Sequence, residues 1–136
     1  MSILRIFLTI VAAIAAWIVT HMLVGELISL AAILFCPEEF GSGGVCYVDW
    51  WNDVVFISDV IGVGLSACAT ILAAVWAANS HRQRVSRVTY YIGMLMASGL
   101  VISTWLSWLA VMSWLSALVF GWLTVKYLDQ RDVIQS

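Results

Sequence analysis

The chain has 136 residues, of which 63% are apolar and only 10% are charged, and its formal net charge is −2. About a quarter of the residues in a soluble domain are charged, and a soluble fold of this composition would expose large, aggregation-prone apolar patches. The sequence also lacks a basic face with interleaved aromatic residues, which argues against a nucleic-acid partner. A lipid bilayer fits the composition, and the apolar runs predict helices because a membrane-spanning backbone must satisfy its own hydrogen bonds.

The first apolar run covers residues 6–35. As one helix it would be about 45 Å long, against about 30 Å for the hydrocarbon core of a bilayer. We therefore expect residues 6–27 to span the membrane and residues 28–35 to extend into the outer interface. We interpret this run as an uncleaved anchor and not a signal peptide, because it continues without a break past the small residues at 13–16.

The second run, residues 54–78, has the length of a single span. The third, residues 88–125, contains no charged residue and would be about 57 Å long as one helix, nearly twice the hydrocarbon thickness. Two spans, 88–105 and 109–126, joined by a turn near 104–109, fit better. Trp105 and Trp108 would then lie at the membrane interface, where tryptophan is enriched.

The distribution of charge tests this count of four spans. The six basic residues are Arg5, Arg82, Arg84, Arg87, Lys126 and Arg131. Four spans place all six on one face, which the positive-inside rule identifies as cytoplasmic. The opposite face carries the acidic residues Glu38, Glu39, Asp49 and Asp53 and no base. The sequence thus predicts a single all-α domain, residues 1–136, in a bacterial-type inner membrane. Four transmembrane helices form a small bundle with both termini cytoplasmic and residues 36–53 outside.

The outer loop contains Cys36 and Cys46, separated by nine residues that include three glycines. A non-cytoplasmic compartment permits a disulfide between them, and the flexible segment can close at modest entropic cost. We interpret the pair as a structural cross-link. A quinone-linked thiol oxidoreductase is a minor alternative, because the spacing is not C-x-x-C and no second pair is present to relay electrons.

Two tryptophans, Trp50 and Trp51, lie between this cysteine pair and the second span. They would set the depth of that span in the outer interface. The alternative is that they form a docking surface, since aromatic residues are enriched at contact hot spots. The sequence does not separate these two roles.

Three ionisable residues, His21, Glu26 and Asp59, fall within the outer half of predicted spans, where such groups are costly and are candidate functional residues. His21 and Glu26 are five positions apart, or about 140° around a helix. One interpretation is that the acids are hydrated at the interface and His21 makes one interhelical hydrogen bond. A second is a proton-exchanging polar pocket. A third is pairing with charges on another subunit.

The second span also carries small residues at strict four-residue spacing, which lets another helix approach closely. They are Gly62, Ser66, Thr70, Ala74 and Ala78. This packing ridge would serve either the internal bundle or a second subunit.

No phosphate-binding, dinucleotide-binding or zinc-protease motif occurs, and no catalytic residue, metal or cofactor is predicted. We prefer a non-enzymatic accessory or assembly subunit of a larger membrane complex, surrounded by lipid and contacting other membrane subunits or further copies of itself. The alternative is a homo-oligomeric carrier or channel for protons, ions or a small solute, with a path through His21, Glu26 and Asp59.

Overall fold

The computed structural model describes residues 3–37, 39, 41–42, 45–78, 81–105 and 107–135. Helices make up nearly all of this part of the chain: α1 (Ile3–Phe35), α2 (Asp49–Ala78), α3 (Arg82–Ser103) and α4 (Trp108–Gln135). Two short antiparallel strands, β1 (Gly41–Ser42) and β2 (Val45–Cys46), form a small hairpin between α1 and α2. Each of the four helices contains a segment long and apolar enough to cross a membrane. The predicted all-helical class with four potential spans is confirmed.

The helices extend past the expected spans, because a helix need not end where its apolar segment ends. The first, α1, is one unbroken helix of 33 residues, so residues 28–35 continue the same axis. The third begins at Arg82, and the fourth continues through Gln135. Among the predicted outer acids, Glu38 lies outside the described residues.

The turn between α3 and α4 lies at residues 104–107, inside the segment where the sequence analysis placed it. Its position is unmarked in the sequence because no glycine occupies it. Instead Trp105 adopts a left-handed backbone conformation, with φ of 55°, which glycine usually supplies. The Trp105 side chain is almost fully exposed.

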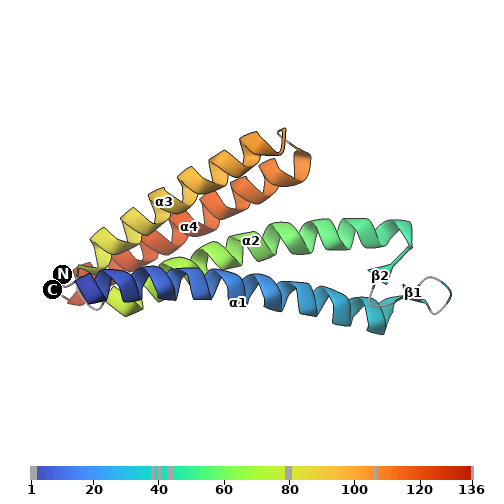
Figure 1. Cartoon of the computed structure of the whole chain (residues 1–136), viewed down its shortest axis with the longest axis horizontal. Helices are drawn as coiled ribbons and strands as arrows, with labels where there is room; N and C mark the ends of the chain where they lie inside the picture. The colour runs from blue at the N-terminus through green and yellow to red at the C-terminus, as the bar shows by residue number, and fades with distance from the viewer. Residues whose placement is uncertain are drawn as a thin grey trace.

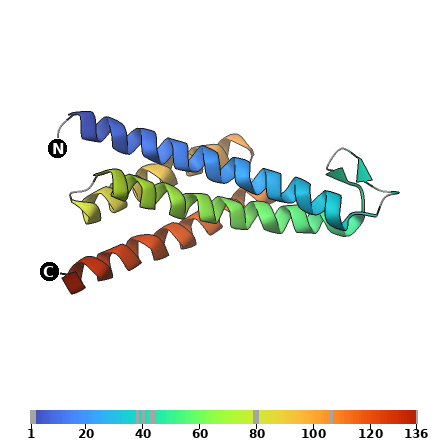
Figure 2. The same ribbon diagram turned by 90° about the horizontal axis from the view of Figure 1, so that it is seen from below.

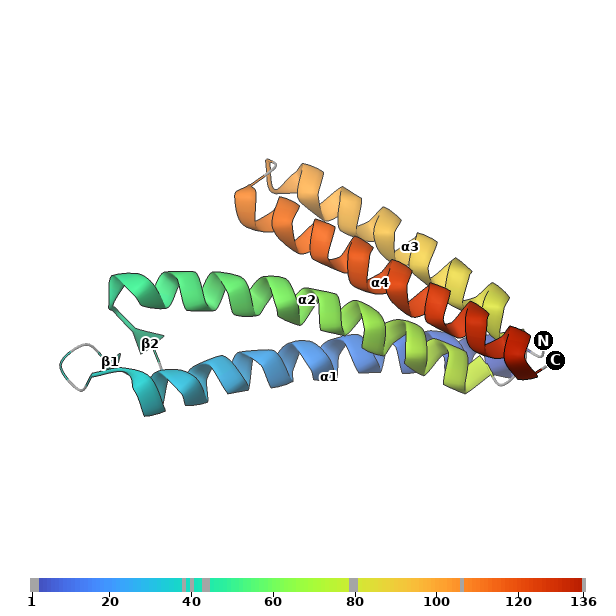
Figure 3. The same cartoon turned by 180° about the vertical axis from the view of Figure 1, so that it is seen from behind.

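The helices form two antiparallel hairpins, α1–α2 and α3–α4. Figures 1, 2 and 3 place both chain termini at one end of the molecule, which we call the terminal end, and β1 and β2 at the other. The α3–α4 hairpin packs on α2 near the terminal end and diverges from it toward the β strands (Figures 1 and 3). In the described part of the chain α1 packs mainly against α2 and β2.

The α1–α2 hairpin is longer than its neighbour. At 1.5 Å per residue α1 is about 50 Å long and α3 only about 33 Å. Figure 1 shows α1 and α2 continuing well past the α3–α4 turn. We define the hairpin tip as residues 27–36 and 46–57, which comprise the last part of α1, Cys46 of β2 and the first part of α2.

Two glycines allow α4 to approach its neighbours closely. A Cβ atom on Gly64 of α2 would lie 2.5 Å from Ser116 Oγ and 2.8 Å from the Phe120 ring. On Gly121 of α4, a Cβ would lie 2.8 Å from the Tyr90 ring of α3. Small residues at contacts of this kind are how membrane helices associate without a hydrophobic driving force between them.

A hydrogen bond also joins α3 and α4. The Trp114 indole N–H donates to Ser98 Oγ at 3.0 Å, and the Ser98 hydroxyl donates to the Met94 carbonyl at 2.8 Å. Ser98→Ala leaves the half-buried indole N–H without its acceptor, so we expect it to destabilise the chain by about 1–3 kcal/mol. The measurement is the thermal unfolding midpoint in detergent.

Ser103→Ala is the matched control for this prediction. The Ser103 hydroxyl is exposed and, among the described residues, donates only to the Leu100 carbonyl of its own helix. Equal midpoints for Ser98→Ala and Ser103→Ala would show that the hydrogen bond between Trp114 and Ser98 contributes nothing to stability.

Candidate functional site: the hairpin of α1 and α2

The hairpin tip is closed by a disulfide between Cys36, at the end of α1, and Cys46, in β2. The two Cα atoms are 5.7 Å apart. Cys46 is buried in a small apolar cluster with Ala32 of α1 and Trp51 of α2. The disulfide therefore lies within the packed part of the tip, where it joins the end of one helix to the connection that leads into the next.

The two tryptophans of the tip have different surroundings. Trp51 is only 4% exposed and is a core residue of the tip, whereas Trp50 is 50% exposed and meets Trp51 edge-on at 5.7 Å between ring centroids. Of the two tryptophans considered for a docking surface, only Trp50 is exposed. Trp51 packs in one cluster with Cys46 and Ala32 of α1, and the sequence alone does not fix the rotation of α2 that turns this side chain inward.

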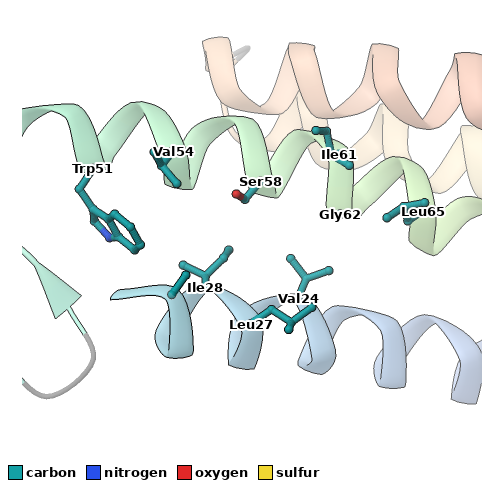
Figure 4. Close-up of a pocket in the computed structure, with 10 residues that line it drawn as sticks. Val24, Leu27, Ile28, Trp51, Val54, Ser58, Ile61, Gly62 and Leu65 are labelled. Carbon is teal, nitrogen blue, oxygen red and sulfur yellow. The ribbon is translucent and has the colours of Figure 1, made fainter. Parts of the chain in front are cut away.

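Between α1 and α2 lies an open apolar groove of about 250 Å³ (Figure 4). Trp51 stands at one end of it, and Ser58 supplies the single hydroxyl among the lining side chains. Gly62 brings the helices together beside the groove, since a Cβ there would lie 2.8 Å from Val24 Cγ1. The remaining lining residues are Leu27, Ile28, Ala31, Val54, Ile61 and Leu65. The lining of the groove is therefore an apolar surface with almost no hydrogen-bonding groups.

The three ionisable candidates do not line this groove. His21 is exposed and stacks on Trp17 one turn earlier, with ring centroids 5.8 Å apart. Glu26 is exposed and lies two residues after the α2-facing Val24, which is about 200° around the helix. Asp59 is half-buried on α2.

No hydrogen bond or ion pair joins these three side chains to one another or to any other described residue. No group of three potential metal ligands occurs within the described residues either. The structure therefore does not assemble the polar pocket that was one interpretation of the sequence. No two of the three ionisable side chains interact with each other, and the contact that His21 makes is its stacking on Trp17.

The packing ridge of α2 is largely used inside the chain. Gly62 contacts α1, and Ser66, Ala74 and Ala78 are all buried. Only Thr70 is half-buried, and its hydroxyl donates to the Ser66 carbonyl at 2.7 Å. Little of this ridge is left for a second subunit.

The residues that join α2 to α4 were not predicted from the sequence. Cys68 Sγ lies 3.0 Å from the Thr124 hydroxyl oxygen and 3.6 Å from the Phe120 carbonyl oxygen. Gly64, one turn before Cys68, lies against the same stretch of α4. The i, i+4 spacing of a glycine and a cysteine is a second small-residue contact surface, and could have been recognised beside the longer ridge.

An ion pair between α3 and α4 was also missed. The Arg87 guanidinium donates to Asp129 Oδ2 at 2.7 Å near the terminal end. The sequence predicts for Arg87 only a place on the basic cytoplasmic face. The pair is partly exposed, and such pairs contribute about 0–1 kcal/mol, so we regard it as a minor stabilising contact.

The fold and the hairpin together define a class: an all-helical chain with four helices able to span a membrane and a disulfide-closed tip on the longer helical hairpin. No protein family, curated protein or solved structure matches this chain.

Proposed function

We propose that the chain is a non-enzymatic accessory or assembly subunit of a larger membrane complex. It would lie in an inner membrane, with the terminal end in the cytoplasm and the hairpin tip on the outer side. Arg5 in α1 and Arg82, Arg84 and Arg87 in α3 all belong to the terminal end, whereas Asp49 and Asp53 belong to the tip. The positive-inside rule supports this orientation.

The observation that carries the proposal is the exposed apolar surface of the hairpin tip. If Arg5 marks the inner boundary, a hydrocarbon core of about 30 Å ends roughly 20 residues later, near Gly25. Leu30, Ile33 and Leu34 then lie beyond the hydrocarbon, and all three are exposed, Ile33 by 67%. Exposed apolar patches outside lipid mark interaction sites, so another protein would cover them.

The alternative functions receive less support from the geometry. A carrier path would need its polar groups to converge, yet His21 and Glu26 lie about 140° apart on α1, and among the described residues neither side chain has a hydrogen bond with Asp59. A thiol oxidoreductase needs an accessible sulfur, whereas Cys46 is buried against Trp51 and Ala32.

Photocrosslinking in cells of the native host tests the proposal. A photoreactive amino acid at the exposed Ile33 should give an adduct with a protein of different sequence. The matched control is Ile28, on the face of α1 that packs against α2, where adducts should form within the chain alone. Adducts only with lipid, or only with further copies of the chain, would contradict the proposal.

A further inference from the structure

The face of α1 that points away from α2 carries a regular exposed stripe. Val24, Ile28 and Ala31 line the groove with α2. The stripe lies on the opposite side, within an arc of about 80° at 100° per residue. Its members, called here the α1 stripe, are Val19, Leu23, Glu26, Leu30 and Ile33. Its four apolar side chains are between 52% and 67% exposed.

The spacing of the α1 stripe alternates between four and three residues, and Glu26 lies seven residues from both Val19 and Ile33. A repeat of seven with two apolar positions is the pattern by which one helix packs along another. A single polar residue within such a seam fixes the register of the partner helix. The stripe therefore has the form of a helix-packing surface with one polar position at its centre.

Glu26 restricts what can cover this stripe. Its carboxylate has no hydrogen bond or ion pair among the described residues. A helix lying along the stripe would remove water from the carboxylate, which is unfavourable unless the carboxylate gains a new partner. The occupant that best meets this requirement brings a base to the level of Glu26.

A second copy of the chain does not meet this requirement. In a two-fold arrangement a stripe packs against the same stripe, which would place one Glu26 carboxylate against another. The stripe contains no base, and Arg5 lies 21 residues, or about 32 Å, away along α1.

Lipid alone does not meet the requirement either. With Arg5 at the inner boundary and about 1.5 Å per residue, the hydrocarbon core ends near Gly25. Val19 and Leu23 then lie within the hydrocarbon, whereas Leu30 and Ile33 lie beyond it. Acyl chains would cover one half of the stripe and leave the other half wet.

We infer that the α1 stripe is the docking surface for a helix of a different protein, one that presents apolar side chains at the same spacing and one lysine or arginine opposite Glu26. This inference rests on the proposed function and names the kind of partner. The partner helix would cross the outer boundary of the membrane alongside α1.

Synthetic transmembrane peptides test the inference on the full-length protein. Three leucine–alanine helices with uncharged ends differ only at one position near the outer boundary, which holds lysine, leucine or glutamate. Their association with the labelled chain is measured by energy transfer in phosphatidylcholine vesicles. We expect the lysine peptide to bind about tenfold more tightly than the leucine peptide, which is about 1.4 kcal/mol, and the glutamate peptide to bind most weakly.

Two variants test whether the preference for the lysine peptide depends on Glu26. Glu26→Gln should abolish the preference for lysine, whereas Asp59→Asn, which removes an acid outside the stripe, should leave it unchanged. Equal binding of the three peptides to the unmodified chain, or a preference for lysine that survives in Glu26→Gln, would overturn the inference.

The failure of this inference and that of the proposed function are distinguishable. If the chain is purified from its host only as a homo-oligomer, yet prefers the lysine peptide through Glu26, the docking surface is supported and the proposed function is contradicted. If the native assembly contains other proteins but the chain shows no preference among the peptides, the proposed function is supported and the docking surface is overturned.

Discussion

Gly64→Val should separate α4 from α2 and destabilise the chain by about 3 kcal/mol. A Cβ at this position meets Ser116 Oγ at 2.5 Å and the Phe120 ring at 2.8 Å, and valine adds two further methyl groups in the same space. Overpacking of this kind typically costs 1–3 kcal/mol. The thermal unfolding midpoint in detergent should fall, and Cys68, which lies beside Phe120 in the same contact, should react faster with a thiol reagent.

Gly93→Val is the matched control for Gly64→Val. Gly93 is also inside a helix, but nothing lies within 4 Å of where its Cβ would be. The unfolding midpoint of Gly93→Val should change little, because valine has a better helix propensity than glycine and meets no neighbour here. If the two variants unfolded at the same temperature, the result would contradict a close contact between α2 and α4.

The double variant Cys36→Ser, Cys46→Ser should destabilise the hairpin tip by about 2–3 kcal/mol, the loop-entropy value for a cross-link that closes roughly ten residues. It should also place a hydroxyl in the apolar cluster around Trp51 and Ala32. A glutamate-specific protease should then cut more quickly at Glu38 or Glu39, which lie within the closed loop.

Reductant gives the control for this prediction. It should accelerate cleavage of the unmodified chain and of Cys68→Ala to the same extent, because Cys68 is outside the disulfide. It should not affect the double variant. A double variant that resists protease as well as the oxidised chain does would show that the disulfide does not hold the tip closed.

Features set by length and composition could be predicted from the sequence. The apolar runs fixed the number of helices because a bilayer sets how long an apolar segment must be. The α3–α4 turn could be placed by the same reasoning even though Trp105, and not glycine, adopts the left-handed conformation there. The pairing of Cys36 with Cys46 followed from there being only one pair in the outer loop.

Features set by the rotation of each helix about its axis could not be predicted. The burial of Trp51 and the exposure of Glu26 depend on which face of each helix meets its neighbour. Several faces of α1 are apolar, so hydrophobicity does not select one. The close contact of Gly62 with Val24 does determine which face of α1 meets α2. This contact can be recognised only once the two helices are paired.

The proposed role of this chain as a subunit among other proteins is tested most directly by its native mass after gentle detergent extraction from its own host, with the co-purifying chains identified by mass spectrometry. We expect a large assembly that contains different membrane proteins in fixed proportion. A lone chain, or an assembly of this chain only, would contradict this role.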